Sequence, residues 1–265
     1  MVAAYKTLSI RKNGPVDWLT LDRPEALNTL TIDMVEELGR YFSALESDSS
    51  VRVVVLRGAG GQFCAGLDLK DMGPRLASMD SAAMYAFQRR LSRIVLAMRR
   101  CPQPIIALLE GAACGGGLAL ALASDVRYCT GDVRMNAAFI RIGLTGCDMG
   151  ASYLMQRLVG ASVAAEVLMT GRFLSAERAQ ALGLISLVVA ASELEAAAES
   201  LAADLLRAEP LALALTKQAL NANLAAPSLE AALEMEDRQQ TLMASGPEFA
   251  ARIRAFLSRG EQTRD

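Results

Sequence analysis

PIIALLEGAACGGGLALALASD, residues 104–125, joins a strand, a turn and a helix in one short stretch. The apolar run Ile105–Leu109 predicts a buried strand, and a Glu-Gly pair ends it. Three consecutive glycines, residues 115–117, then precede a second apolar run, Leu118–Ala123, which predicts a helix. Glycines occur in such numbers mainly where the backbone turns tightly or approaches another group closely. The rest of the chain is expected to be organised around this strand–turn–helix unit.

The glycine triplet has two interpretations. A helix that begins on glycine offers unshielded backbone N–H groups, and the positive end of its dipole, to an anion. The triplet is then one half of a site for a developing oxyanion. The alternative is a glycine-rich buried turn with no chemical role, and this stretch alone leaves both open.

The composition narrows the class of protein. The 265 residues are 52% hydrophobic and 21% charged, with a formal net charge of −2, so we expect a folded protein that binds neither nucleic acid nor membrane. Histidine is absent, which excludes Ser-His-Asp and Cys-His catalysis and histidine-bound metal or haem. The five cysteines show no C-x-x-C spacing, and the N-terminus shows no secretory signal. We therefore expect a cytoplasmic chain with reduced cysteines, no metal and no cofactor.

Strands and helices alternate in the first half, which favours parallel β-α-β units with right-handed crossovers. The turn-forming residues Asn13-Gly14-Pro15 predict that the first two strands form a hairpin. The expected strands are Tyr5–Arg11, Val16–Leu21, Val51–Leu56, Ile105–Leu109, Val126–Cys129 and Met135–Phe139. The expected helices follow an N-cap at Thr31 and span Ser81–Arg100 and Leu118–Ala123.

The second half is expected to be helical, at 151–159, 161–169, 175–182, 192–207, 210–223, 228–243 and 247–258. The fold class is therefore α/β with a helical C-terminal extension. We place a core domain at residues 1–200 and a C-terminal helical region at 201–265. The glycine-rich segments match neither G-x-G-x-x-G nor a P-loop, which argues against nucleotide binding.

Two loops follow buried strands and end in small residues where a helix is expected. One is Phe63-Cys64-Ala65-Gly66-Leu67-Asp68, and the other is Cys114-Gly115-Gly116-Gly117. An enzyme that stabilises an enolate needs two backbone N–H groups converging on one oxygen with no side chain between them. Losing one such donor costs about 3–4 kcal/mol of barrier.

Together these loops closely resemble those of the crotonase family, the enoyl-CoA hydratase/isomerase superfamily. The resemblance extends over nearly the whole chain. It rests on Leu21-Asp22-Arg23-Pro24 with Asn28, Phe63–Leu69, Glu110–Asp125, Gly171-Arg172-Phe173, and Ala179 with Leu182-Gly183-Leu184. It implies a spiral of β-β-α turns, a C-terminal helical region that forms trimers or dimers of trimers, and a coenzyme A thioester as substrate.

The resemblance also implies the site residues. The catalytic oxyanion donors would be the backbone N–H groups of Ala65 and Gly116. The loop of Ala65, Gly66, Leu67, Asp68 and Leu69 would border the coenzyme A, with Gly115, Gly116, Ala119 and Phe139 completing the substrate site.

The sequence departs from the hydratases of this family at two positions. Those enzymes carry two glutamates that position a water molecule and transfer its proton. The matching residues here are Ala119 and Phe139, neither of which can transfer a proton. Water addition by the two-glutamate route is therefore not expected.

Asp148 is the candidate replacement. An acidic residue at the matching position serves catalysis in dienoyl-CoA isomerases, β-diketone hydrolases and an aryl-CoA dehalogenase. The alternative is that Asp148 caps a helix beginning near Met149. In an apolar pocket its pKa should be raised, which suits a carboxylate that shuttles a proton.

We therefore expect an acyl-CoA enzyme that holds a thioester enolate and moves a proton with Asp148, as in double-bond isomerisation. C–C hydrolysis, or another reaction of an acyl-CoA that depends on this aspartate, is one alternative. The other is a non-catalytic oligomer that binds acyl-CoA.

Overall fold

The computed structural model describes residues 5–262 and divides the chain into two compact units, with the division between Leu205 and Leu206. The division expected after residue 200 falls inside helix α8 (Ala191–Leu206). The first unit is α/β and contains both sheets, while the second consists of helices.

A six-stranded sheet with strand order β1-β2-β3-β4-β6-β9 organises the first unit. Its strands are β1 (Leu8–Asn13), β2 (Val16–Leu21), β3 (Val53–Gly58), β4 (Ile105–Leu109), β6 (Val126–Thr130) and β9 (Leu187–Val189). The first two strands form the expected antiparallel hairpin, and every other neighbouring pair is parallel. Neighbouring parallel strands follow one another in chain order, so the chain winds steadily in one direction.

A second, three-stranded sheet contains β5 (Ala112–Cys114), β7 (Arg134–Asn136) and β8 (Leu174–Ser175). Strands of the two sheets alternate along the chain. After β4 come β5 and helix α4 (Gly116–Ala123), and after β6 come β7 and the 3₁₀ helix η2 (Ala138–Ile142). The predicted spiral of β-β-α turns is therefore confirmed.

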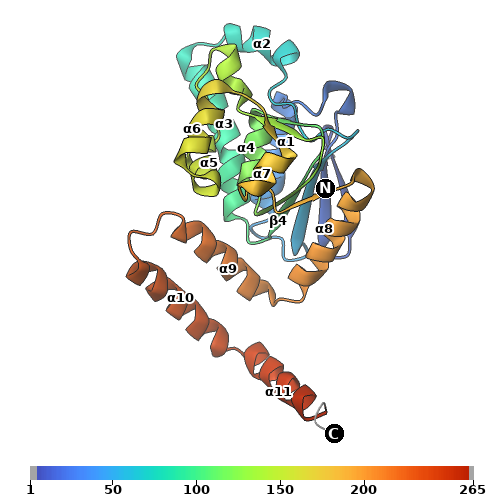
Figure 1. Ribbon diagram of the computed structural model, residues 1–265, viewed down its shortest axis with the longest axis vertical. Helices are drawn as coiled ribbons and strands as arrows, with labels where there is room; N and C mark the ends of the chain where they lie inside the picture. The colour runs from blue at the N-terminus through green and yellow to red at the C-terminus, as the bar shows by residue number, and fades with distance from the viewer. Residues whose placement is uncertain (1–4, 263–265) are drawn as a thin grey trace. The chain divides into compact units, whose positions relative to one another are not determined.

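Helices cover the large sheet. Thr31 caps α1 (Ile32–Ala44) as expected, and α3 (Ser81–Arg100) has the predicted bounds. Helices α1, α3 and α4 lie together against the strands (Figure 1). The other helices of this unit are η1 (Pro24–Ala26), α2 (Leu69–Ala77), α5 (Ala151–Val159), α6 (Ala161–Thr170), α7 (Ala176–Ala181) and α8.

Two local expectations need correction. Helix α4 begins at Gly116 rather than Leu118, because two of the three glycines already adopt helical geometry. The strand expected at Met135–Phe139 ends at Asn136, and the chain then turns into η2. The helix expected where the Phe63–Asp68 loop ends is α2, and it continues through a Gly73-Pro74 pair that normally marks a turn.

The beginning of α4 packs directly on the loop that follows β3. A Cβ added to Gly117 would lie 2.2 Å from the carbonyl oxygen of Cys64, so only glycine allows this approach. All eight residues of α4 are buried, as are all five of β4. The strand–turn–helix unit is thus the centre of the core, and it fixes the position of the Phe63–Asp68 loop.

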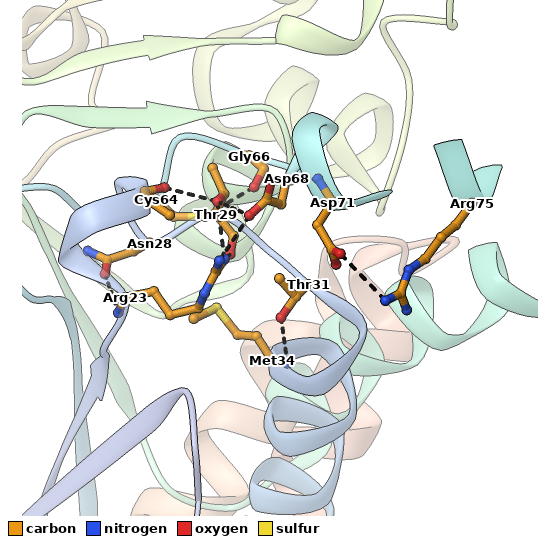
Figure 2. A network of polar contacts seen from close by, with 11 residues as sticks. Arg23, Asn28, Thr29, Thr31, Met34, Cys64, Gly66, Asp68, Asp71 and Arg75 are labelled. Carbon is orange, nitrogen blue, oxygen red and sulfur yellow. Dashed lines mark hydrogen bonds and ion pairs between the residues drawn. The ribbon is translucent and has the colours of Figure 1, made fainter. Parts of the chain in front are cut away.

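A polar network holds the end of the same loop (Figure 2). Arg23 forms an ion pair with Asp68 at 3.0 Å and donates to the carbonyl oxygen of Thr29 at 2.7 Å. Asp68 also accepts hydrogen bonds from the Thr29 hydroxyl and from Asp71 N–H, which makes it the N-cap of α2. Burial alone would raise the pKa of Asp68, but the bonds from Asp71, Arg23 and Thr29 together lower it.

The second unit contains α9 (Pro210–Asn223), α10 (Leu229–Ala244) and α11 (Pro247–Gln262). Helix α10 contacts both α9 and α11. Large apolar side chains on these helices are exposed in the single chain, among them Leu220, Leu229, Leu242 and Phe256. The described helices include none that is long and apolar enough to cross a membrane.

Substituting Gly117 with alanine should destabilise the protein by about 1–3 kcal/mol, because the new methyl group would overlap a backbone carbonyl that cannot move freely. Gly39, inside α1, is the matched control: a Cβ there has no neighbour within 4 Å. Gly39→Ala should stabilise the chain by about 0.5–1 kcal/mol. Urea unfolding of both variants measures the difference, and equal stabilities would contradict the packing described.

Asp68→Asn should lower the free energy of unfolding at pH 7 by about 1–3 kcal/mol, because hydrogen bonds to a charged group are lost. The folded-state pKa of Asp68 lies below its unfolded value. Its contribution is therefore present above the unfolded pKa and disappears as the pH falls through the folded one.

Urea unfolding of wild type and Asp68→Asn from pH 7 into the acid range tests this dependence. Asp71→Asn is the control, because it keeps the backbone N–H that Asp68 accepts and changes only a side chain in an exposed pair with Arg75 at 3.5 Å. That variant should change stability by less than about 1 kcal/mol. A deficit in Asp68→Asn that persists unchanged at low pH would contradict the charged role.

Candidate active site

A cavity of about 820 Å³ lies beside the two glycine-containing loops. Its lining includes Leu67 and Gly116 from these loops, together with Phe139 and Asp148. Helices α2 and α3 supply much of the remainder, mostly with apolar side chains. A largely apolar cavity with few polar groups is the usual form of a site for a small organic ligand.

Two backbone N–H groups face this cavity without an acceptor. Leu30 pairs with the loop as an isolated parallel bridge: its N–H donates to Gly66 O at 2.7 Å, and its carbonyl accepts from Asp68 N–H at 3.0 Å. Leu67 lies between those two residues, so its own N–H points away from Leu30. Gly116 is the first residue of α4, where no intrahelical acceptor exists. Among the described residues neither N–H donates to another group.

The two loops touch because both lack side chains at the point of contact. A Cβ on Gly66, whose φ is +104°, would lie 3.1 Å from the carbonyl oxygen of Cys114 and 3.8 Å from the Cα of Gly115. This contact brings Leu67 and Gly116 to the same cavity wall. The helix dipole of α4 adds partial positive charge at Gly116. The pair is therefore suited to stabilising an anionic oxygen.

The Ala65 N–H group predicted as an oxyanion donor is already engaged. It donates to the carbonyl oxygen of Leu27 at 3.0 Å. A donor used within the protein cannot also point at a ligand, so this expectation is corrected. The N–H group available on this loop is that of Leu67, two residues later, and Gly116 keeps the position expected of it.

The other expected substrate contacts divide into two groups. Phe139 lies in the cavity lining. Gly66, Asp68, Leu69, Gly115 and Ala119 are not among the described residues that line the cavity. Asp68 is bound in the Arg23 network, and Leu69 is 48% exposed at the start of α2. Ala119 is completely buried inside α4, so its methyl group belongs to the core.

Asp148 lines the cavity and is not the cap of a helix. Helix α5 begins at Ala151 with Gly150 as its N-cap and without a side-chain cap. The carboxylate instead accepts from Met149 N–H at 2.6 Å and from the side-chain amide of Gln88. The sulfur of Met149 lies 3.6 Å from where a Cβ on Gly116 would be, which places Asp148 next to the start of α4.

Burial raises the pKa of Asp148, and the hydrogen bonds from Met149 N–H and Gln88 counteract this only in part. The carboxylate is half-buried among apolar side chains. A carboxyl group whose pKa is moved toward neutrality is better suited to accept and return a proton. The pocket therefore combines a half-buried carboxylate with two N–H groups that have no acceptor among the described residues.

Sequence reasoning missed Gln88 and assigned the wrong donor on the Phe63–Asp68 loop. Gln88 lies on a correctly predicted helix, but it is 60 residues from Asp148 in sequence, and no local pattern links them. The donor depends on the pairing of Leu30 with Leu67, which is also a contact between distant segments.

Comparisons with known proteins agree with this architecture. The family model described as enoyl-CoA hydratase/isomerase matches residues 11–263. A Mycobacterium bovis relative named a probable enoyl-CoA hydratase, echA12, is 40% identical over 222 residues, which are 82% of this chain and 78% of the relative. The 1,2-epoxyphenylacetyl-CoA isomerase of Escherichia coli strain K12 is 32% identical over 241 residues, 91% of each chain.

The same similarity extends to solved structures. The crystal structure of an enoyl-CoA hydratase from Mycobacterium smegmatis has a TM-score of 0.90 and 31% identity, and the match covers 96% of this chain and 97% of that one. The family model, the relatives and the fold therefore agree over nearly the full length. This chain belongs to the enoyl-CoA hydratase/isomerase family, the crotonase superfamily.

Proposed function

We propose that this protein is an isomerase that moves a carbon–carbon double bond in an acyl-CoA thioester. One observation carries the proposal: a single half-buried carboxylate, Asp148, shares a cavity with the Leu67 and Gly116 N–H groups. The Escherichia coli relative is named as an isomerase of a coenzyme A thioester, which supports the same class of reaction.

The two N–H groups would bind the thioester oxygen. When a proton leaves the carbon beside the thioester, negative charge develops on that oxygen as the enolate forms. Leu67 N–H and Gly116 N–H stabilise this charge more strongly than they stabilise the neutral carbonyl. Each donor is worth about 3–4 kcal/mol of barrier in sites of this kind.

Asp148 would carry the proton. Starting from a 3-enoyl-CoA, the carboxylate removes a proton from C2, and the electron pair spreads over the oxygen, C2 and C4. The carboxylic acid then returns the proton to C4, which leaves the double bond between C2 and C3. The step is balanced without water, a metal or a redox partner.

The same geometry argues against hydration. The positions matching the hydratase glutamates are Ala119, buried in α4, and Phe139, on the cavity wall. Asp80 also lines the cavity, but it caps α3 by accepting from Ala83 N–H. It lies about 12 Å along the helix axis from Gln88. A second carboxylate that could position water beside Asp148 is therefore absent from the described lining.

The acyl group is expected to be apolar. The cavity is lined by Leu76 from α2, by Met79 from the segment after α2, and by Met84 from α3. From Gln88, which contacts Asp148, the lining continues toward the start of α3 as far as Ser81, about 10 Å of helix axis. An extended chain advances about 1.2 Å per bond, so this wall accommodates roughly eight bonds. We infer medium-length hydrocarbon or ring-containing acyl groups.

We also propose that the C-terminal helices serve self-assembly into a trimer or a dimer of trimers. The large apolar side chains that α9, α10 and α11 leave exposed support this, because an interface between subunits would remove them from water.

Asp148→Asn should abolish most isomerisation, lowering kcat by about 10²–10⁴-fold, because an amide cannot accept the proton. The assay follows 2-enoyl-, 3-enoyl- and dienoyl-CoA thioesters of four to ten acyl carbons by chromatography of the products. Asp33→Asn, an exposed residue paired with Lys6 on the surface, is the matched control and should keep wild-type activity.

Hydration that proceeds at an equal rate in wild type and Asp148→Asn would overturn the proposal, because water would then be activated by other groups. Binding of the thioesters without any product, unchanged in the variant, would instead indicate a non-catalytic acyl-CoA-binding protein. Cleavage of a β-diketone thioester that requires Asp148 would replace isomerisation by C–C hydrolysis.

A single carboxylate predicts that part of the transferred hydrogen stays with the substrate. A 3-enoyl-CoA carrying deuterium at C2, isomerised in ordinary water, should retain a measurable fraction of that deuterium at C4. The new hydrogen should enter on the face from which the first one left. Mass spectrometry and NMR of the product measure both. Entry from the opposite face would require a second proton donor and contradict the one-carboxylate mechanism.

A further inference from the structure

We propose that Gln88 is a positioning residue that holds one oxygen of Asp148 and leaves the other to carry the proton. The inference builds on the proposed isomerase function but has a test of its own. Gln88 projects from α3, while Asp148 lies in the loop before α5, so the contact joins two elements that are distant in sequence.

The two oxygens of the carboxylate have different surroundings. Oδ1 accepts from both Met149 N–H and the Gln88 side-chain amide. Oδ2 accepts no hydrogen bond from any described residue, although Asp148 lines the cavity. Two donors on one oxygen fix the plane and rotation of the carboxylate. Proton transfer is therefore assigned to Oδ2.

Met149 gives this arrangement a rigid support. Its backbone is in the left-handed region with a φ of +47°, which is uncommon for a residue with a side chain, and its side chain is buried. Gln88 is the second support, and it is the only one of the two donors that substitution can remove. Its neighbours Phe87 and Leu91 are buried, so the helix that carries it is fixed to the core.

A neutral amide suits this role better than a cation. A cation would lower the pKa of Asp148 strongly and weaken it as a base. The titratable side chains that share the cavity are Asp80 and Tyr85, both near the start of α3. Arg90, on the same helix, pairs with Glu36 at 3.0 Å, and Arg141 of η2 lies over the ring of Phe173. Neither arginine lines the cavity.

Gln88→Met tests the proposal, because methionine keeps the length of the side chain but cannot donate. We expect kcat for isomerisation to fall by roughly 10²-fold with KM nearly unchanged, since misplacing a reacting group has an effect of that size. The acid limb of the pH profile should move to higher pH, because a hydrogen bond that favours the charged carboxylate is lost.

Ser92→Ala is the control. The Ser92 hydroxyl donates to the backbone carbonyl of Gln88 within the same helix and is not hydrogen-bonded to Asp148. This variant should leave kcat and the pH profile unchanged.

A second measurement does not depend on turnover. Infrared difference spectra across a pH titration identify the Asp148 carboxyl band as the one that Asp148→Asn removes. In Gln88→Met this band should titrate at higher pH than in wild type. Equal titration and equal kcat in wild type and Gln88→Met would overturn the role of Gln88. A shifted titration in a protein that isomerises none of the thioesters would support that role while overturning the isomerase proposal.

Discussion

The close approach of two backbone segments is the constraint on which the rest of the structure depends. The first turn of α4 lies so close to the loop after β3 that a Cβ on Gly117 would be only 2.2 Å from the Cys64 carbonyl oxygen. On the other loop, Gly66 also lies close to the backbone before α4, because a Cβ there would be 3.1 Å from the Cys114 carbonyl oxygen. Because no side chain separates the segments, two N–H groups from different parts of the chain open into one cavity. Neither segment could form the site alone.

The second feature of the site is its contrast in polarity. Apolar walls raise the pKa of Asp148, while a few directed hydrogen bonds keep its carboxylate in one orientation. Asp68 has the opposite surroundings, because Arg23 and the donors around it favour its charged form. One aspartate is thereby suited to moving a proton and the other to bracing a loop. The two carboxylates differ in role because they differ in environment.

Much of the fold could be predicted from local pattern. The five-residue apolar strand β4, the Thr31 cap and the bounds of α3 all follow from periodicity and from residues that begin or end elements. The extent of helix α2 could not be predicted in this way, because burial of Met72 and capping by Asp68 let the helix continue through a Gly-Pro pair. The short strand β5 was missed for a different reason: three residues are too few to show the alternation of a strand.

The sequence by itself determined that the chain is α/β, that a glycine triplet lies at the start of the central helix, and that Ala119 and Phe139 cannot transfer a proton. These are properties of residue type and short-range order. Only the tertiary structure decided that Leu67 rather than Ala65 has a free N–H, and that Gln88 holds Asp148. The reason is physical: whether a donor is free depends on the segment that packs beside it, and that segment lies tens of residues away.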